Sequence, residues 1–212
     1  MYKRQLLTRD LLFDLGGVIV DIDRQKCVEA FQALGFSDIA SFLGEYGQKG
    51  IFLQLEEGKV TPSRWRQALR PHMPESVTDT QIDDAFQAFI TGIPRERLQA
   101  LRDLRAKGHR LYVISNTNAV MWDGIIADLF RQEGLSVDDY FDGIVTSFEA
   151  GCCKPDPQIF NLVLDRFGLN APEVTFFDDS ADNCRRAAEM GFRAIHVLSL
   201  IHISEPTRLG MI

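Results

Sequence analysis

The fold of this 212-residue chain depends on the stretch Leu11-Leu12-Phe13-Asp14-Leu15-Gly16-Gly17-Val18-Ile19-Val20-Asp21-Ile22-Asp23. It begins as an apolar run, is interrupted by the Asp14 carboxylate, passes two glycines and continues as a second apolar run. Apolar runs of roughly four to eight residues bounded by turn signals are typical of strands buried on both faces of a parallel sheet. Asp14 would then lie at the carboxyl end of the first strand, the edge where open α/β sheets bind ligands. The alternative is an acidic residue that only starts a turn.

The rest of the chain alternates between short apolar runs and segments with apolar residues at helical spacing. Later strands are predicted over 110–114, 143–146, 174–177 and 192–197. Such alternation predicts an α/β fold: a doubly wound, Rossmann-like parallel sheet with right-handed crossovers and helices on both faces.

Residues 21–93 differ from this pattern, because their apolar residues fall at helical spacing in several segments separated by glycines and prolines. We predict an all-helical insert of three or four helices here, placed after the first strand and standing over the carboxyl edge of the sheet as a lid. Residues 1–20 and 94–197 would form the core domain. Within the insert, Trp65 is expected to pack in the interior. Candidate substrate contacts are Tyr46, Gln54 and Glu57.

The composition is typical of a soluble globular protein, with 45% hydrophobic and 25% charged residues. A net charge of −7 argues against nucleic acids and membrane surfaces as partners, but a single local cation would suffice for a small phosphorylated metabolite. No apolar stretch reaches the length of a membrane span and no signal peptide is recognisable, so a cytoplasmic protein is expected. The cysteines lack zinc-ligand spacing and are expected to be reduced thiols.

The last residues of the chain, 198–212, resemble the translated sequence of a transposase adapter that is used in DNA library preparation. The match begins where the fifth strand should end. We therefore expect the native sequence to be truncated near Val197 and the segment 198–212 to be artefactual, and we infer no function from that segment.

Polar residues follow the predicted strands at the points where they end. These are Asp14, Ser115-Asn116, Lys154 and Asp178-Asp179. Each has a structural alternative: a turn or helix cap for the serine and asparagine, a solvated loop for the lysine, and a favourable helix dipole for the paired aspartates. Because the carboxyl ends of parallel strands share one edge, the set as a whole points to one site.

The chemistry that suits this set is phosphoryl transfer. Asp14 is a carboxylate that can attack phosphorus and form an acyl phosphate. Together with Asp179 it offers hard oxygen ligands for Mg²⁺, which offsets the repulsion between nucleophile and phosphate. Lys154 adds positive charge, and the Ser115 hydroxyl is suited to a phosphate oxygen.

The chain resembles the haloacid dehalogenase superfamily of aspartate-nucleophile phosphohydrolases from Leu11 to Val197. Its motifs stand in family order, and the helical insert occupies the place of a C1-type cap. The strings Phe13–Asp23, Ser115–Asn118 and Phe176–Asn183 are most similar to the bacterial α-glucose-1-phosphate phosphatase branch. The resemblance implies a Mg²⁺-dependent phosphatase. The implied metal ligands are Asp14, the Gly16 carbonyl, Asp179, and Asp178 through the metal's waters. The implied phosphate and catalytic residues are the nucleophile Asp14, Ser115, Asn116 and Lys154.

One position departs from the family pattern. The superfamily usually carries a second aspartate two residues after the nucleophile, as general acid and base, and here that residue is Gly16. Such a group is worth about 10²–10⁴-fold in rate. Its loss should favour leaving groups that are easily expelled, such as a sugar anomeric oxygen. Asp21 or Asp23 would have to reach in from the following loop to replace it.

Three functions follow from these features. A Mg²⁺-dependent phosphatase of small phosphorylated metabolites, with sugar phosphates as the expected class, uses the whole motif set. A hydrolytic 2-haloacid dehalogenase would use Asp14 without metal, but Asp178-Asp179 would repel a carboxylate substrate. A catalytically weak binding or regulatory protein is the third alternative, and only Gly16 favours it.

Overall fold

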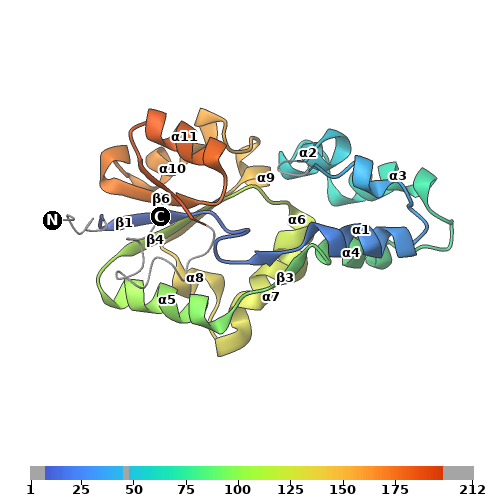
Figure 1. The fold of residues 1–212 in the computed structure, drawn as a ribbon, viewed down its shortest axis with the longest axis horizontal. Helices are drawn as coiled ribbons and strands as arrows, with labels where there is room; N and C mark the ends of the chain where they lie inside the picture. Colours follow the sequence, from blue (N-terminus) through green and yellow to red (C-terminus); the bar gives the residue numbers. More distant parts are fainter. Residues whose placement is uncertain (1–7, 45–47, 198–212) are drawn as a thin grey trace.

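A five-stranded parallel sheet forms the centre of the computed structural model, which describes residues 8–44 and 48–197 (Figure 1). The strand order is β5-β4-β1-β6-β7. The strands are β1 Asp10–Phe13, β4 Arg110–Ser115, β5 Gly143–Thr146, β6 Val174–Asp178 and β7 Arg193–His196. The predicted α/β fold is confirmed, with the first strand in the middle and hydrogen-bonded on both sides. The segment 198–212 and the candidate Tyr46 lie outside the described residues.

Helices cover both faces of the sheet (Figure 1). One face is covered by α5 Arg95–Ala106 and α8 Val137–Tyr140, and the other by α10 Pro157–Phe167 and α11 Ala181–Glu189. The alternation of side chains along β1 explains why the strand has no polar face: Leu11 and Phe13 belong to one buried cluster and Leu12 to the other. A strand buried on both faces is therefore an uninterrupted apolar run.

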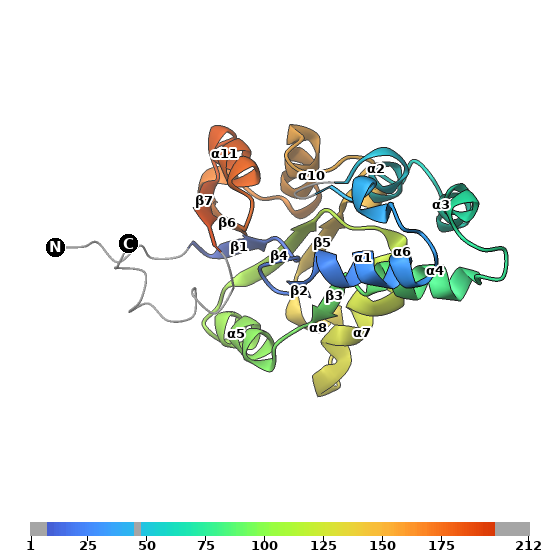
Figure 2. The ribbon, with the colours of Figure 1, turned by 45° about the vertical axis from the view of Figure 1, so that its right-hand side comes forward.

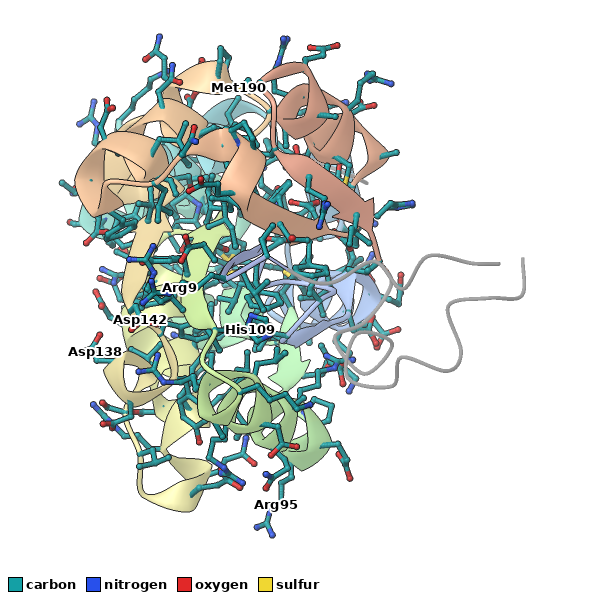
Figure 3. All side chains as sticks on the ribbon, turned by 90° about the vertical axis from the view of Figure 1, so that its left-hand side faces the viewer. Arg9, Arg95, His109, Asp138, Asp142 and Met190 are labelled. Atoms are coloured by element: carbon teal, nitrogen blue, oxygen red, sulfur yellow. The ribbon has the colours of Figure 1, made fainter. Side chains whose placement is uncertain are left out.

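Polar contacts stabilise the edge of the sheet at which the parallel strands begin, and Figure 3 views the molecule from this edge. Asp142 accepts hydrogen bonds from the Leu111 amide and from Arg105, at 2.8 and 2.7 Å. His109 Nδ1 lies 2.9 Å from the carbonyl oxygen of Thr8. Both groups are held by neighbouring chain segments, so we assign this edge a structural role.

Residues between β1 and α5 form a separate group of helices beyond the carboxyl ends of the strands (Figure 1). The helices are α1 Arg24–Ala33, α2 Gly50–Glu56, α3 Pro62–Leu69 and α4 Asp79–Gln87. The expectation of an all-helical insert is wrong at its base, where β2 Asp21–Ile22 pairs antiparallel with β3 Ile90–Gly92 (Figure 2). Strands of two and three residues are too short to produce a period-two pattern in the sequence.

Aromatic side chains fill the interior of this helical group. Trp65 is fully buried, as expected, with its ring 5.6 Å from Phe52 and 4.9 Å from Phe86. Phe31 meets Phe52 edge to face at 6.5 Å. Because these rings come from four helices, they fix the helices relative to one another.

The helical group contacts the sheet domain at two further places. Helix α4 packs against α6 Ala119–Met121, where Gln87 Nε2 donates to the Val120 carbonyl at 3.1 Å. Helix α2 packs against α9 Ser147–Ala150. Both partners directly follow strands of the sheet, so the helical group stands over the edge to which the polar motifs were assigned. None of the helices in the described part of the chain is long and apolar enough to cross a bilayer.

Candidate active site

Lys154 brings the strand-end residues together. Its Nζ lies 2.7 Å from Asp14 Oδ1 and 2.7 Å from Asp178 Oδ2, and the residue is 5% exposed. Asp14 directly follows β1, Asp178 is the last residue of the neighbouring β6, and Lys154 enters from the loop after α9. The parallel sheet therefore joins residues that are more than a hundred positions apart in the chain.

Three carboxylates surround this lysine. Asp14, Asp178 and Asp179 each offer an oxygen, and these oxygens all lie within 4.8 Å of one another. Burial raises the pKa of Asp14 despite the opposing attraction of Lys154, and the charges of Asp178 and Asp179 add to the effect. Burial, then the charge of Asp178, raises the pKa of Asp179 as well. The cluster thus has more negative charge than one lysine neutralises.

The lysine itself stays protonated. Burial alone would lower the pKa of Lys154, but the charges of Asp14 and Asp178 and its hydrogen bonds to both outweigh burial and raise it. A fixed ammonium group between two carboxylates is suited to stabilising negative charge that develops beside Asp14.

Asp178 is saturated with hydrogen bonds. Besides Lys154, it accepts from the Ser180 amide at 2.7 Å and from Asn183 Nδ2 at 3.1 Å. Its carboxylate is fully buried, whereas Asp179 is partly exposed. Asp178 therefore holds Lys154 in place, and Asp179 has the more accessible oxygens. Asn183 was given no role from the sequence, since nothing in its spacing distinguishes it from an ordinary first-turn residue of α11.

The two glycines after Asp14 occupy different environments. Gly17 has φ +75°, and a Cβ there would lie 2.8 Å from Cγ of Asp179 and closer still to Oδ2, so only glycine allows this approach. At Gly16 a Cβ would meet only Ile22, with Cγ2 3.5 Å away, which is ordinary contact. The absence of a side chain at Gly16 is therefore not imposed by the space around it.

Ser115 and Asn116 lie where β4 ends. Ser115 is buried at the last position of that strand. The Asn116 side chain is bonded to the backbone of Lys154: Nδ2 donates to its carbonyl at 2.9 Å, and Oδ1 accepts from its amide at 2.7 Å. In the structure the Asn116 side chain thus positions the backbone of Lys154.

The two aspartates that were considered as replacements for an acid at Gly16 are engaged elsewhere. Asp21 Oδ1 pairs with Arg97 Nη2 at 2.7 Å. Asp23 caps helix α1 by accepting from the Gln25 amide at 2.9 Å. In the structure both side chains therefore have partners other than Asp14.

The candidate substrate contacts of the helical group differ in exposure and in their partners. Gln54 is exposed, and Glu57 forms an ion pair with Lys59 at 2.8 Å. Glu56, which the sequence did not single out, is only partly exposed, and burial raises its pKa to about 8. The four cysteines are free thiols, as expected.

Known proteins resemble this chain over most of its length. A family model for haloacid dehalogenase-like hydrolases matches residues 11–191. D-ribitol-5-phosphate phosphatase from Bacteroides thetaiotaomicron is 34% identical over 186 residues, which are 88% of this chain and 90% of that protein. Among solved structures, the HAD-family enzyme BT-2542 from the same species, in complex with magnesium and inorganic phosphate, has a TM-score of 0.83 and 37% identity, covering 89% of this chain and 93% of that chain. A predicted HAD-like hydrolase from Porphyromonas gingivalis has a TM-score of 0.82 and 31% identity, covering 90% and 91%.

Proposed function

The chain belongs to the haloacid dehalogenase-like hydrolase family and is a phosphatase of that family, and from this premise we propose that it hydrolyses small sugar or alditol phosphates through an aspartyl-phosphate on Asp14. The observation that carries the proposal is the pair of 2.7 Å contacts from Lys154 to Asp14 and Asp178, beside the third carboxylate of Asp179. The substrate class is supported by the related D-ribitol-5-phosphate phosphatase.

Mg²⁺ is the cofactor that this donor set fits. The oxygens are hard donors, they converge within 4.8 Å, and the three carboxylates exceed the one lysine in charge. We propose that Asp14, Asp179 and the Gly16 carbonyl hold the ion, with Asp178 supporting its waters. When bound, it supplies the positive charge that lets a carboxylate approach a phosphate dianion. The magnesium and phosphate complex of the related BT-2542 supports this assignment.

Each residue of the proposed site has its own role in the reaction. Asp14 forms a bond to phosphorus as the ester oxygen leaves, and water then cleaves the Asp14–phosphorus bond to release phosphate. The Lys154 ammonium stabilises the charge on the transferring group, and Asp178 and Asn116 keep it in place. The Ser115 hydroxyl donates to a phosphate oxygen. No side chain at Gly16 protonates the leaving oxygen, so easily expelled alcohols should react best.

The test is hydrolysis of p-nitrophenyl phosphate, hexose phosphates and D-ribitol 5-phosphate, with and without EDTA. We expect Mg²⁺-dependent turnover that Asp14→Asn abolishes. Asp138→Asn, an exposed change at the opposite edge (Figure 3), is the matched control. Turnover that persists unchanged in Asp14→Asn would reject the proposal. Phosphate binding without turnover of any ester would instead identify a binding or regulatory protein.

A further inference from the structure

The end of helix α2 lies against α9, the short helix that precedes the loop carrying Lys154. Helix α2 packs on α9, and Figure 1 shows the two side by side. Gly58, just beyond α2, has φ +62°, and a Cβ there would overlap the Phe148 carbonyl, lying 3.0 Å from its carbon. The backbone at Gly58 therefore lies so close to the backbone of Phe148 that a side chain at position 58 would not fit. The preceding residues of α2 lie beside α9, which ends four residues before Lys154.

Glu56 is the acidic residue that this approach leaves without a partner. No hydrogen bond or ion pair joins it to another residue of the described segments, whereas its neighbour Glu57 is paired with Lys59. Of the charged groups that act on the Cys153 thiol, Glu56 has the largest effect, and Cys153 immediately precedes Lys154. Glu56 is thus a partly exposed, unpaired carboxyl beside the loop of the proposed catalytic lysine.

The position of Glu56 matches the part of a substrate that extends beyond the phosphate. Glu56 is the last residue of α2, in the helical group, whereas Asp14 and Lys154 pair with each other at the strand ends. A general acid would have to contact the bridging oxygen, which lies next to Asp14. A carboxyl in the helical group, beyond the strand ends, is suited to contact with the alcohol portion of the ester rather than with its leaving oxygen.

We propose that Glu56 is a specificity-determining residue, which hydrogen-bonds a hydroxyl of an uncharged, polyhydroxylated leaving group and disfavours leaving groups that carry a second anion. This inference rests on the proposed phosphatase function and narrows its substrate class. Burial raises the pKa of Glu56 to about 8, so near neutral pH much of the carboxyl both donates and accepts, as a hydroxyl does. As the pH rises through this pKa the carboxyl ionises, and it then repels a substrate carboxylate.

The experiment compares Glu56→Leu and Glu56→Gln with the wild type on three esters: an alditol phosphate, 2-phosphoglycolate and p-nitrophenyl phosphate. Loss of one hydrogen bond in a partly buried site should lower the ratio of kcat/KM for the alditol phosphate over p-nitrophenyl phosphate by about tenfold in Glu56→Leu. Most of this change should appear in KM. Glu56→Gln keeps a donor and an acceptor, so its kcat/KM ratio for the alditol phosphate over p-nitrophenyl phosphate should be close to that of the wild type. In both variants kcat/KM for 2-phosphoglycolate should rise relative to kcat/KM for the alditol phosphate.

Two further measurements keep the outcome decisive. Glu75→Gln, an exposed change in the same helical group, should leave the ratio unchanged. Binding of the alditol phosphate, compared with inorganic phosphate, should weaken about tenfold in Glu56→Leu, and this readout needs no turnover. If the wild type binds but hydrolyses no ester, the proposed function fails and the binding ratio still tests Glu56. Equal losses on all three esters, or an unchanged binding ratio, would overturn the assignment.

Discussion

Gly16→Asp should give the site the acid that it lacks. The backbone at Gly16 lies outside the left-handed region, and a Cβ there would make only ordinary contacts with Ile22, at 3.5 and 3.8 Å. Ile22 is itself 41% exposed, so it can move aside. The new carboxyl would stand two residues after Asp14, near a cluster of like charges that favours its protonated form. A protonated carboxyl is the form that an acid needs.

The size of the gain depends on the leaving group. A positioned general acid contributes about 10²–10⁴-fold, and we expect the lower end because no other residue has been arranged to orient the new side chain. A gain of about 100-fold in kcat/KM corresponds to about 2.7 kcal/mol of transition-state stabilisation. This gain applies to alkyl phosphates, whose alkoxide leaves poorly. An aryl oxide needs no proton, so kcat/KM for p-nitrophenyl phosphate, which reports only the steps up to release of the aryl oxide, should change by less than about threefold.

The assay is kcat/KM for an alkyl phosphate and for p-nitrophenyl phosphate at the same Mg²⁺ concentration. Gly16→Asn is the matched control, because it has the same shape and no transferable proton. The Asp variant should exceed the Asn variant on the alkyl ester alone. Equal rates for Asp and Asn, with both proteins folded, would show that proton transfer to the leaving group is not what position 16 limits.

Three other variants test the site and its setting. Lys154→Met should cost about 3–5 kcal/mol of unfolding free energy in urea, because it leaves buried carboxylates unpaired. Burial raises the pKa of Asp14 even with the lysine present, and removal of the lysine charge that opposes this should raise it further in the variant. Because stability falls as pH rises through a raised folded-state pKa, the variant should lose more stability relative to the wild type at pH 8 than at pH 5. Gly17→Ala should raise the Mg²⁺ concentration needed for half-maximal activity at least tenfold, because the new Cβ would displace Asp179. Gly134→Ala introduces the same backbone strain, at φ +76°, but has no neighbour within 4 Å, so it should leave the Mg²⁺ requirement unchanged. Gly58→Ala should lower kcat/KM for alditol phosphates severalfold, and Gly168→Ala, with φ +61° and open space, should not. An equal response in either glycine pair would contradict the contacts assigned to Gly17 and Gly58.

The sheet was predictable because its strands are buried on both faces. Their apolar runs, such as Leu11–Phe13 and 174–177, are visible without any knowledge of their neighbours. Parallel pairing then requires that their carboxyl ends share an edge, so the gathering of Asp14 and Asp178 follows from the order of strands and helices alone. The β2–β3 pair has no such signal, because it exists only through the contact between its two short partners.

The candidate site was only partly predictable for a related reason. Asn116 has a side chain of the right kind for a phosphate, but its amide is used on both sides by the backbone of Lys154, and no local pattern reveals that. The engagement of Asp21 by Arg97 likewise depends on a contact between residues far apart in the chain. Sequence reasoning therefore identified which residues meet, but not which of their atoms remain free.

The part of the proposed site that binds phosphate and the part that binds the alcohol also differ in how far the sequence predicts them. The phosphate end is built from strand termini, whose positions follow from a backbone pattern common to parallel sheets. The alcohol end depends on where α2 rests against α9, which is decided by one close approach at Gly58 and by the aromatic interior that fixes the helical group. A substitution that leaves the sheet intact can therefore move Glu56 without disturbing Asp14. It follows that substrate preference should change through residues such as Gly58 more readily than the chemistry does.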